Sequence, residues 1–165
     1  SKLAKVRLIA LITFALAALW GCLGGREQRK DLLGYTTVAY WRANCGWSDF
    51  AAPGYSPDSA RSARIGRLAR ERDASFLICA SAGCSTCRDE VPRILRLLEA
   101  AQVPPERIRF LGLDRYAEDP AGEYKKYEVE FIPAVAVICS DKFIGLASFP
   151  SMDWERDIIK ILEKK

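Results

Sequence analysis

The pattern of apolar and polar positions predicts a chain that alternates between strands and helices. Short apolar or β-branched runs predict five strands, at residues 35–41, 75–80, 107–114, 134–140 and 143–149. Helical spacing and capping residues predict four helices, at 59–73, 86–101, 121–127 and 153–163. Asp58 and Ser151 are the expected N-caps of the first and last helices. This order predicts an α/β fold with helices on both faces of a central mixed sheet.

The first 21 residues have the pattern of an export signal. The positive SKLAKVR precedes LIALITFALAALW, which is too short for a bilayer span of roughly 20 residues but suits the apolar region of a signal peptide. The run ends in Leu19, Gly21 and Cys22, which resemble the lipobox of bacterial lipoproteins, where cleavage precedes a cysteine that is then lipidated. We therefore expect a lipoprotein signal peptide at 1–21 and a lipid anchor on Cys22. The alternative is an ordinary signal or an uncleaved anchor. Each places the body in the cell envelope, on the extracytoplasmic face, where disulfides persist.

Composition limits the size and the chemistry of the body. A chain of 165 residues with 50% hydrophobic content buries one good core. We expect a tether at 22–34, an N-terminal extension of strand and loop at 35–58, and one domain at 59–165. Three of the 25 Lys and Arg residues lie in the signal, so the body is nearly neutral and lacks the charge of a nucleic-acid binder. The absence of histidine excludes Ser-His-Asp and Cys-His catalysis and histidine-ligated metal sites within this sequence.

The stretch AGCSTCRDE carries the main candidate chemistry. Cys84 and Cys87 stand just before and within a predicted helix, whose unpaired N–H groups stabilise a thiolate. Cys84 would then attack a disulfide, and Cys87 would resolve the mixed disulfide. A zinc site needs two close ligand pairs, whereas Cys45, Cys79 and Cys139 are isolated. A structural clip between two cysteines so close in sequence removes little chain entropy. Redox chemistry without a metal is therefore the leading interpretation.

From about residue 59 to 162 the chain resembles the thioredoxin superfamily. FLICASAGCSTC resembles the strand that leads into the active site of that family. Pro92 matches the proline that kinks its active-site helix, and Ile132-Pro133 takes the place of its cis-proline dipeptide. Gly145 matches the glycine of its last hairpin. Together these four features are much more specific than a Cys-x-x-Cys motif alone.

The resemblance implies a thioredoxin-like fold and a membrane-anchored protein thiol–disulfide oxidoreductase. Cys84 would be the nucleophile, Cys87 the resolving thiol, and the two would form a redox-active disulfide. Ile132, Pro133 and Gly83 would bind the substrate chain. No cofactor is needed, because the partners would be protein thiol or disulfide clients and a redox protein that recycles the pair. We expect a monomer, and oxidase, reductase and isomerase activity all remain open.

Departures from the family pattern leave a second function open. Ile78 stands where thioredoxins often carry a buried Asp, and Gly83 replaces the usual aromatic residue before the first cysteine. Glu90 and Asp114 are candidate replacement carboxylates, although residues of this type are more commonly solvated. The alternative is a redox-inert thioredoxin-fold binding or scaffold lipoprotein, in which Cys84 and Cys87 form a structural disulfide.

Three other cysteines and a row of arginines complete the candidates. Cys79 and Cys139 lie in apolar strands and are expected to be buried. Cys45 lies in a polar stretch and is expected to be accessible, able to pair with either of them or to act as an exchange partner. Arginines recur at every third position of the first predicted helix, at Arg61, Arg64, Arg67 and Arg70. A solvated helix face is favoured for this row over a contact with anionic lipid.

Overall fold

The computed structural model describes residues 32–165. The predicted signal peptide, the lipidation site Cys22 and most of the predicted tether therefore lie outside the described residues. Within residues 32–165, no helix is both long and apolar enough to cross a bilayer.

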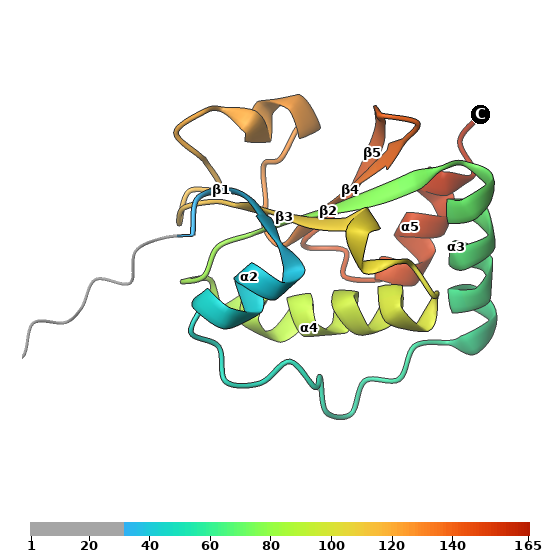
Figure 1. The fold of residues 1–165 in the computed structure, drawn as a ribbon, viewed down its shortest axis with the longest axis horizontal. Helices are drawn as coiled ribbons and strands as arrows, with labels where there is room; N and C mark the ends of the chain where they lie inside the picture. Colours follow the sequence, from blue (N-terminus) through green and yellow to red (C-terminus); the bar gives the residue numbers. More distant parts are fainter. Residues whose placement is uncertain (1–31) are drawn as a thin grey trace, which may run out of the picture. The chain divides into compact units, whose positions relative to one another are not determined.

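Five strands form one mixed sheet at the centre of the described region (Figure 1). Along the sheet they follow the order β1 (Gly34–Thr37), β3 (Ile108–Gly112), β2 (Ala74–Ala80), β4 (Ala134–Cys139) and β5 (Lys142–Ser148). The pair β2 and β3 is parallel, and the other neighbours are antiparallel. The helices are α2 (Val38–Asn44), α3 (Ser59–Glu71), α4 (Ser85–Ala100), α5 (Trp154–Leu162) and the short 3-10 helices η1 (Pro105–Arg107) and η2 (Glu123–Tyr127). The prediction of an α/β fold with a mixed sheet is confirmed.

The two faces of the sheet are covered differently. Phe76 and Ile78 of β2 point into a large core that includes buried residues of all four α-helices. Leu77 and Cys79, at the alternate positions, point into a smaller core. That second core is covered by the segment 113–131, which contains η2, on the opposite side of the sheet from the α-helices (Figure 1). Helices were expected on both faces, but the second face carries only this short 3-10 helix.

The predicted strand 35–41 is wrong in its second half. β1 ends at Thr37, whose Oγ1 accepts the N–H of Tyr40 at 3.1 Å and so caps α2. The helix then buries Trp41, whose ring stacks on Phe110 of β3 with centroids 4.6 Å apart and planes at 8°. A β-branched and aromatic stretch has a strand preference, but here the packing of one large side chain decides the local structure.

The other helix ends agree more closely with the sequence. Asp58 is confirmed as the N-cap of α3, because its side chain accepts the N–H of Arg61 at 2.8 Å. The N-cap of α5 is Asp153, which accepts the N–H of Arg156, and not Ser151 as expected. Gly145 lies under α5, since a Cβ there would stand 2.9 Å from the side chain of Ile161. The glycine therefore lets the last hairpin and the last helix pack closely.

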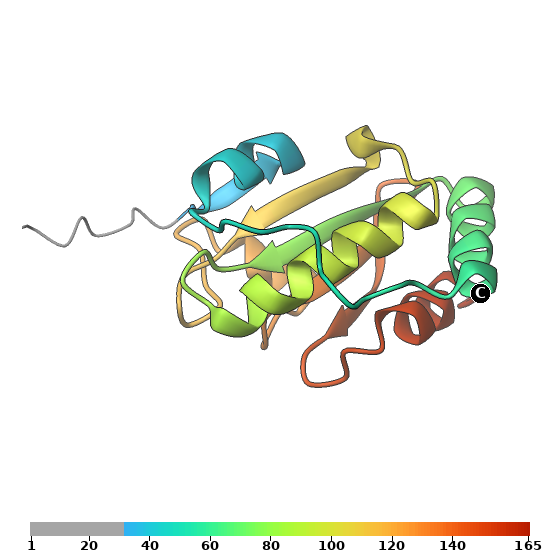
Figure 2. The ribbon, with the colours of Figure 1, turned by 90° about the horizontal axis from the view of Figure 1, so that it is seen from below.

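Residues 45–58, which we call the strap, connect α2 to α3 and run along α4 (Figure 2). Two arginines of α4 hold the strap. Arg96 donates to the carbonyl oxygen of Ala51 at 2.8 Å, and the guanidinium of Arg93 lies 5.8 Å from the ring centroid of Tyr55. The Tyr55 hydroxyl donates to Glu155 of α5 at 3.2 Å. The strap is thus attached to two helices along its length.

Candidate thiol site

Strand β2 carries Cys84 to one edge of the sheet. The strand is almost fully buried and ends at Ala80, and the turn that follows is closed by the Cys84 N–H, which donates to the Ser81 carbonyl at 3.1 Å. Cys84 is the N-cap of α4, with extended backbone angles of φ −83° and ψ 119°. Its Sγ accepts the N–H of Cys87 at 3.0 Å. The sulfur therefore lies over the first turn of a 16-residue helix.

The surroundings of Cys84 favour its thiolate. The pKa of this thiol is lowered from 9.0 to about 7, chiefly by a hydrogen bond from the Cys87 side chain. Partial burial opposes the shift, and the backbone N–H groups of Cys87 and Thr86 add to it. N–H groups at a helix start carry partial positive charge, so they stabilise an anion placed there. A substantial fraction of Cys84 is thiolate near neutral pH.

Cys87 differs from Cys84 in access and in acidity. Cys87 is fully buried, whereas Cys84 is partly exposed. The pKa of Cys87 is raised, first by the hydrogen bond that its thiol makes to Cys84 and second by burial. Both residues are thiols in this structure. The site therefore holds one accessible thiol poised to ionise and one protected thiol that keeps its proton.

The predicted substrate-binding residues reach the same edge. Strand β4 runs antiparallel to β2, and Ala134 pairs with Cys79, so Pro133 lies beside the end of β2. The Ile132–Pro133 peptide bond is cis, as the sequence led us to expect. The Pro133 carbonyl accepts the N–H of Phe149 at 3.0 Å, which ties the loop before β4 to the loop after β5.

Gly83 leaves open space beside Cys84. A Cβ built at this position would have no heavy atom within 4 Å. No side chain at position 83 restricts the approach of another molecule to Cys84.

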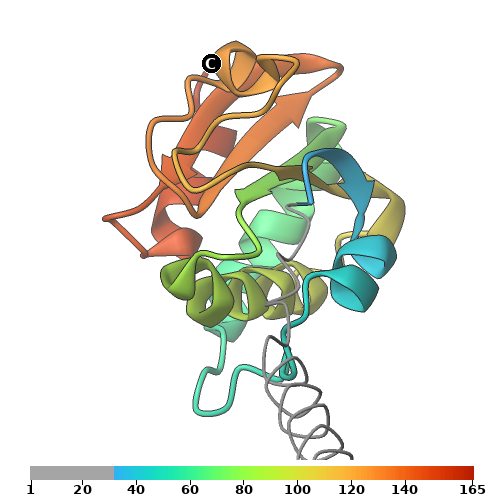
Figure 3. The same ribbon diagram turned by 90° about the vertical axis from the view of Figure 1, so that its left-hand side faces the viewer.

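Loops at this end of the sheet, which faces the viewer in Figure 3, carry exposed apolar side chains. Residues 32–165 expose six large hydrophobic side chains, and four of them stand in loops at this edge: Leu33, Tyr116, Phe131 and Met152. We call these four residues the apolar rim. Tyr116 is 74% exposed and Phe131 is 55% exposed. Each belongs to a different loop, so sequence periodicity alone could not predict that these four residues lie at the same end of the sheet.

Glu90 is buried, contrary to the expectation of a solvated residue. It lies on the second turn of α4, is 6% exposed, and accepts the indole N–H of Trp154 at 2.9 Å and the Arg93 guanidinium at 3.1 Å. The helical face that turns Val91 and Ile94 inward also turns this carboxylate toward α5. Asp114 instead organises a turn, since its Oδ1 accepts the N–H groups of Tyr116 and Glu118.

The remaining cysteines are all in the interior. Cys79 and Cys139 are buried as expected, and burial raises the pKa of each thiol. The expectation that Cys45 is accessible is wrong, because this residue is fully buried at the end of α2. Helix α2 ends at Asn44, and Cys45, its C-cap, lies with Trp41 in the larger core.

The arginine row of α3 is largely paired with carboxylates. Arg61 lies 3.6 Å from Glu155, Arg64 pairs with Glu163, and Arg67 lies 4.0 Å from Glu71 of its own helix. Glu155 belongs to α5 and Glu163 is the C-cap of that helix, so the row helps to join α3 to α5. The interactions agree with the favoured interpretation of a solvated helix face.

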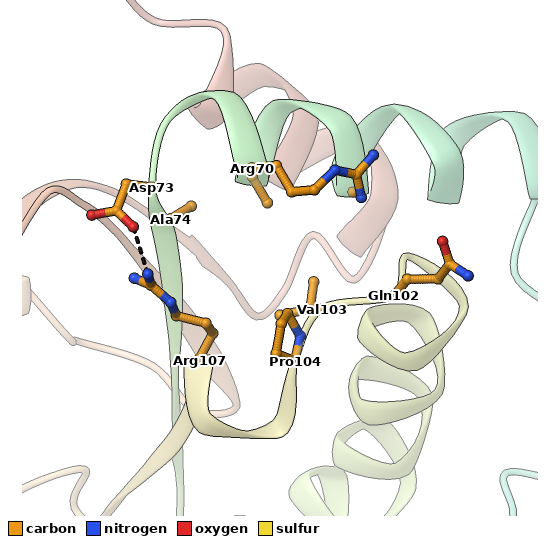
Figure 4. Close-up of a pocket in the computed structure, with 9 residues that line it drawn as sticks. Arg70, Asp73, Ala74, Gln102, Val103, Pro104 and Arg107 are labelled. Atoms are coloured by element: carbon orange, nitrogen blue, oxygen red, sulfur yellow. Dashed lines mark hydrogen bonds and ion pairs between the residues drawn. The ribbon is translucent and has the colours of Figure 1, made fainter.

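A cavity of about 220 Å³ lies at the other end of β2, away from the thiols (Figure 4). Its walls combine apolar residues such as Val103 and Pro104 with Arg70 and with the ion pair of Asp73 and Arg107, whose N–O distance is 2.6 Å. Within residues 32–165, no three His, Cys, Asp or Glu residues stand together as a metal site.

Comparison with known proteins finds no family model, no curated protein and no solved structure that matches this chain.

Proposed function

We propose that this chain is an exported, membrane-anchored thiol–disulfide oxidoreductase with a thioredoxin-like fold, which exchanges disulfides with envelope proteins. The observation that carries the proposal is the difference between the two thiols. Cys84 is partly exposed and has a pKa near 7, and Cys87, one helical turn away, is buried and keeps its proton. A nucleophile must be accessible and ionised, whereas a resolving thiol must stay protected until the mixed disulfide forms.

The sheet order supports the thioredoxin-like part of the proposal. A parallel pair, β2 and β3, lies inside a sheet whose remaining neighbours are antiparallel, and the chain ends in a hairpin followed by a helix. The Cys pair follows the central strand, and a cis-proline loop stands beside it. This is the arrangement that the resemblance implies for residues 59–162.

In the direction of client reduction, the exchange has two steps. The Cys84 thiolate attacks one sulfur of a client disulfide, forms a mixed disulfide, and releases the other client sulfur as a thiolate. Cys87 then loses its proton and attacks Cys84 Sγ, which forms the Cys84–Cys87 disulfide and releases the second client thiolate. Two electrons pass to the client, and a dithiol redox partner returns them. The reverse sequence would oxidise a client.

The apolar rim supports a polypeptide as the substrate. Leu33, Tyr116, Phe131 and Met152 are exposed in loops at the end of the sheet that carries Cys84, where an extended chain with apolar side chains would contact them. The cis-proline loop would align the backbone of that chain beside the nucleophile.

The proposed location rests on the N-terminal pattern. A lipid on Cys22 would hold the body at the membrane surface through the segment that precedes β1. Replacement of Cys22 by Ala is expected to abolish signal processing and membrane partitioning. Unchanged processing and partitioning would exclude the lipid anchor and leave the chemistry of Cys84 and Cys87 unaffected.

The deciding experiment is the reduction potential of the Cys84–Cys87 pair, measured by equilibration with glutathione or dithiothreitol buffers. An exchange protein is expected to equilibrate at potentials above about −300 mV, the region below which structural disulfides lie. A pair that stays oxidised well below that value would favour the redox-inert scaffold instead.

A trapping experiment would then identify the client. Cys87→Ala removes the resolving thiol, so the mixed disulfide on Cys84 should accumulate and be recoverable with its partner. Cys84→Ala is the matched control, because it leaves only the buried thiol and should trap nothing. Equal capture by both variants would contradict the assigned order of attack.

A further inference from the structure

One buried hydrogen bond joins the strap to the turn that leads to Cys84. Trp47, three residues past the end of α2, is 6% exposed, and its indole N–H donates to the carbonyl oxygen of Ala82 at 2.9 Å. Ala82 is also buried and stands two residues before Cys84. A residue of the N-terminal extension therefore holds the backbone of the turn that presents the sulfur.

Aromatic contacts fix the indole ring itself. Trp47 meets Trp41 edge to face, with ring centroids 5.7 Å apart, and its ring centroid also lies 5.7 Å from that of Phe50. The Arg42 guanidinium covers Phe50 at 5.2 Å from the ring centroid. Trp41 in turn stacks on Phe110 of the sheet. The ring that donates to Ala82 is thus braced against the core and has little freedom to turn away.

The turn held in this way sets the position of Cys84 Sγ. Residues 81–84 contain one backbone hydrogen bond, from the Cys84 N–H to the Ser81 carbonyl at 3.1 Å. The Cys87 thiol and the Cys87 N–H, which lies 3.0 Å from the sulfur, both donate to Cys84 Sγ, so the thiolate is stabilised while Sγ keeps this place over the start of α4. Gly83 contributes no side-chain packing to the turn, because its would-be Cβ has no neighbour within 4 Å. The Trp47 indole therefore adds a contact from outside the turn to the hydrogen bonds that hold it.

We propose that Trp47 is a positioning residue for thiol–disulfide exchange: its indole N–H fixes the Ala82 carbonyl, and with it the turn that places Cys84 Sγ over the start of α4. The strap thereby belongs to the redox site although it contributes no reacting atom. This inference rests on the proposed function, since it assigns a residue that prepares the nucleophile.

The chain contains a matched control for this hydrogen bond. Trp41 belongs to the same aromatic cluster and is fully buried, but among the described residues its indole N–H has no hydrogen-bond partner. Trp47→Phe and Trp41→Phe remove the same atoms from neighbouring positions. Only the first of these variants removes a donor to the backbone of the thiol turn.

The measurement is the rate of Cys84 alkylation by iodoacetamide as a function of pH. It is made on the full reduced chain in mild detergent and quantified by peptide mass spectrometry. In the wild type, the midpoint of the curve of alkylation rate against pH should lie near pH 7. In Trp47→Phe it should rise by roughly 0.5 to 2 pH units toward the ordinary thiol value. Trp41→Phe keeps an aromatic ring beside Trp47 and every hydrogen bond to the turn, so its shift should be smaller.

A second variant separates the hydrogen bond from the packing of the ring. Replacing Trp47 with benzothienylalanine puts a sulfur in place of the Nε1–H group and keeps the ring volume. The proposal requires the same upward shift in this variant as in Trp47→Phe. A wild-type midpoint in the benzothienylalanine variant would overturn it.

The alkylation midpoint does not depend on any client. If the wild type failed to exchange disulfides but the Trp47 variants still shifted the midpoint, the proposed function would fail and the positioning role would stand. If the wild type exchanged disulfides and the midpoints did not move, only the positioning role would fail.

Discussion

The two ends of strand β2 differ in the polar groups that they carry. At the end that carries Asp73, an exposed ion pair with Arg107 borders a cavity. At the end that leads to Cys84, the sheet edge is lined by exposed apolar loops, and two thiols have their acidities moved in opposite directions. The cavity lies at the Asp73 end, whereas the perturbed acidities lie at the Cys84 end. Perturbed acidity together with access is therefore the better guide to the site.

The largest effect expected at either end is loss of exchange in Cys84→Ser. A hydroxyl in place of the thiol cannot form the mixed disulfide, so insulin-disulfide reduction should fall to the background rate. Arg107→Gln at the cavity end should keep the full wild-type rate, because that residue takes no part in the chemistry. Appreciable reduction by Cys84→Ser, or a comparable loss in Arg107→Gln, would break the distinction between the two ends.

The buried carboxylate of Glu90 should give the next largest effect, on stability. Glu90→Leu leaves the Trp154 N–H without its acceptor and Arg93 without its partner. An unsatisfied buried donor costs about 1–3 kcal/mol, so the urea midpoint should fall accordingly. Glu90→Gln keeps an amide oxygen for the indole and should lose much less. Equal losses in the two variants would mean that the Trp154 hydrogen bond contributes nothing measurable.

The residues of the thiol end were much easier to predict from the sequence than the residues that pack around them. The Cys84 and Cys87 spacing, the apolar strand before it and the Ile132-Pro133 dipeptide are local patterns, and each falls where it was expected. Burial of Glu90 depends on the position of α5, 64 residues further along the chain. No local periodicity encodes a contact over that distance.

The N-terminal extension shows the same limit. The stretch 35–41 was expected to be a strand because of its residue types, but Trp41 packs on Phe110 and the chain turns into α2. That helix then buries Cys45 and brings Trp47 to Ala82. Because α2 was predicted as part of a strand, neither the burial of Cys45 nor the hydrogen bond from Trp47 to the turn before Cys84 was expected. Tertiary packing, and not local propensity, decided the outcome.

The acidity of Cys84 gives a third expected effect, on reactivity with pH. Because its pKa is lowered to about 7, the thiolate fraction, and with it the alkylation rate, should rise roughly tenfold from pH 6 to pH 8 and then level off. A thiol with an unshifted pKa of 9.0 would still be gaining reactivity above pH 8. Continued growth of the Cys84 rate between pH 8 and 9 would show that the helix start does not stabilise the thiolate.

The smallest effect is expected from the ion pair at the cavity end. Asp73→Asn removes a partner of Arg107, but the two side chains are 57% and 44% exposed, so water and salt already screen the attraction. We expect a change of less than about 1 kcal/mol in the free energy of unfolding, measured in urea at low salt. Raising the salt concentration should shrink even that difference. A larger loss that persists in high salt would mean that Asp73 matters through the backbone at the start of β2. Asp73 would then hold the local structure at the cavity end, a role that its exposed charge does not suggest.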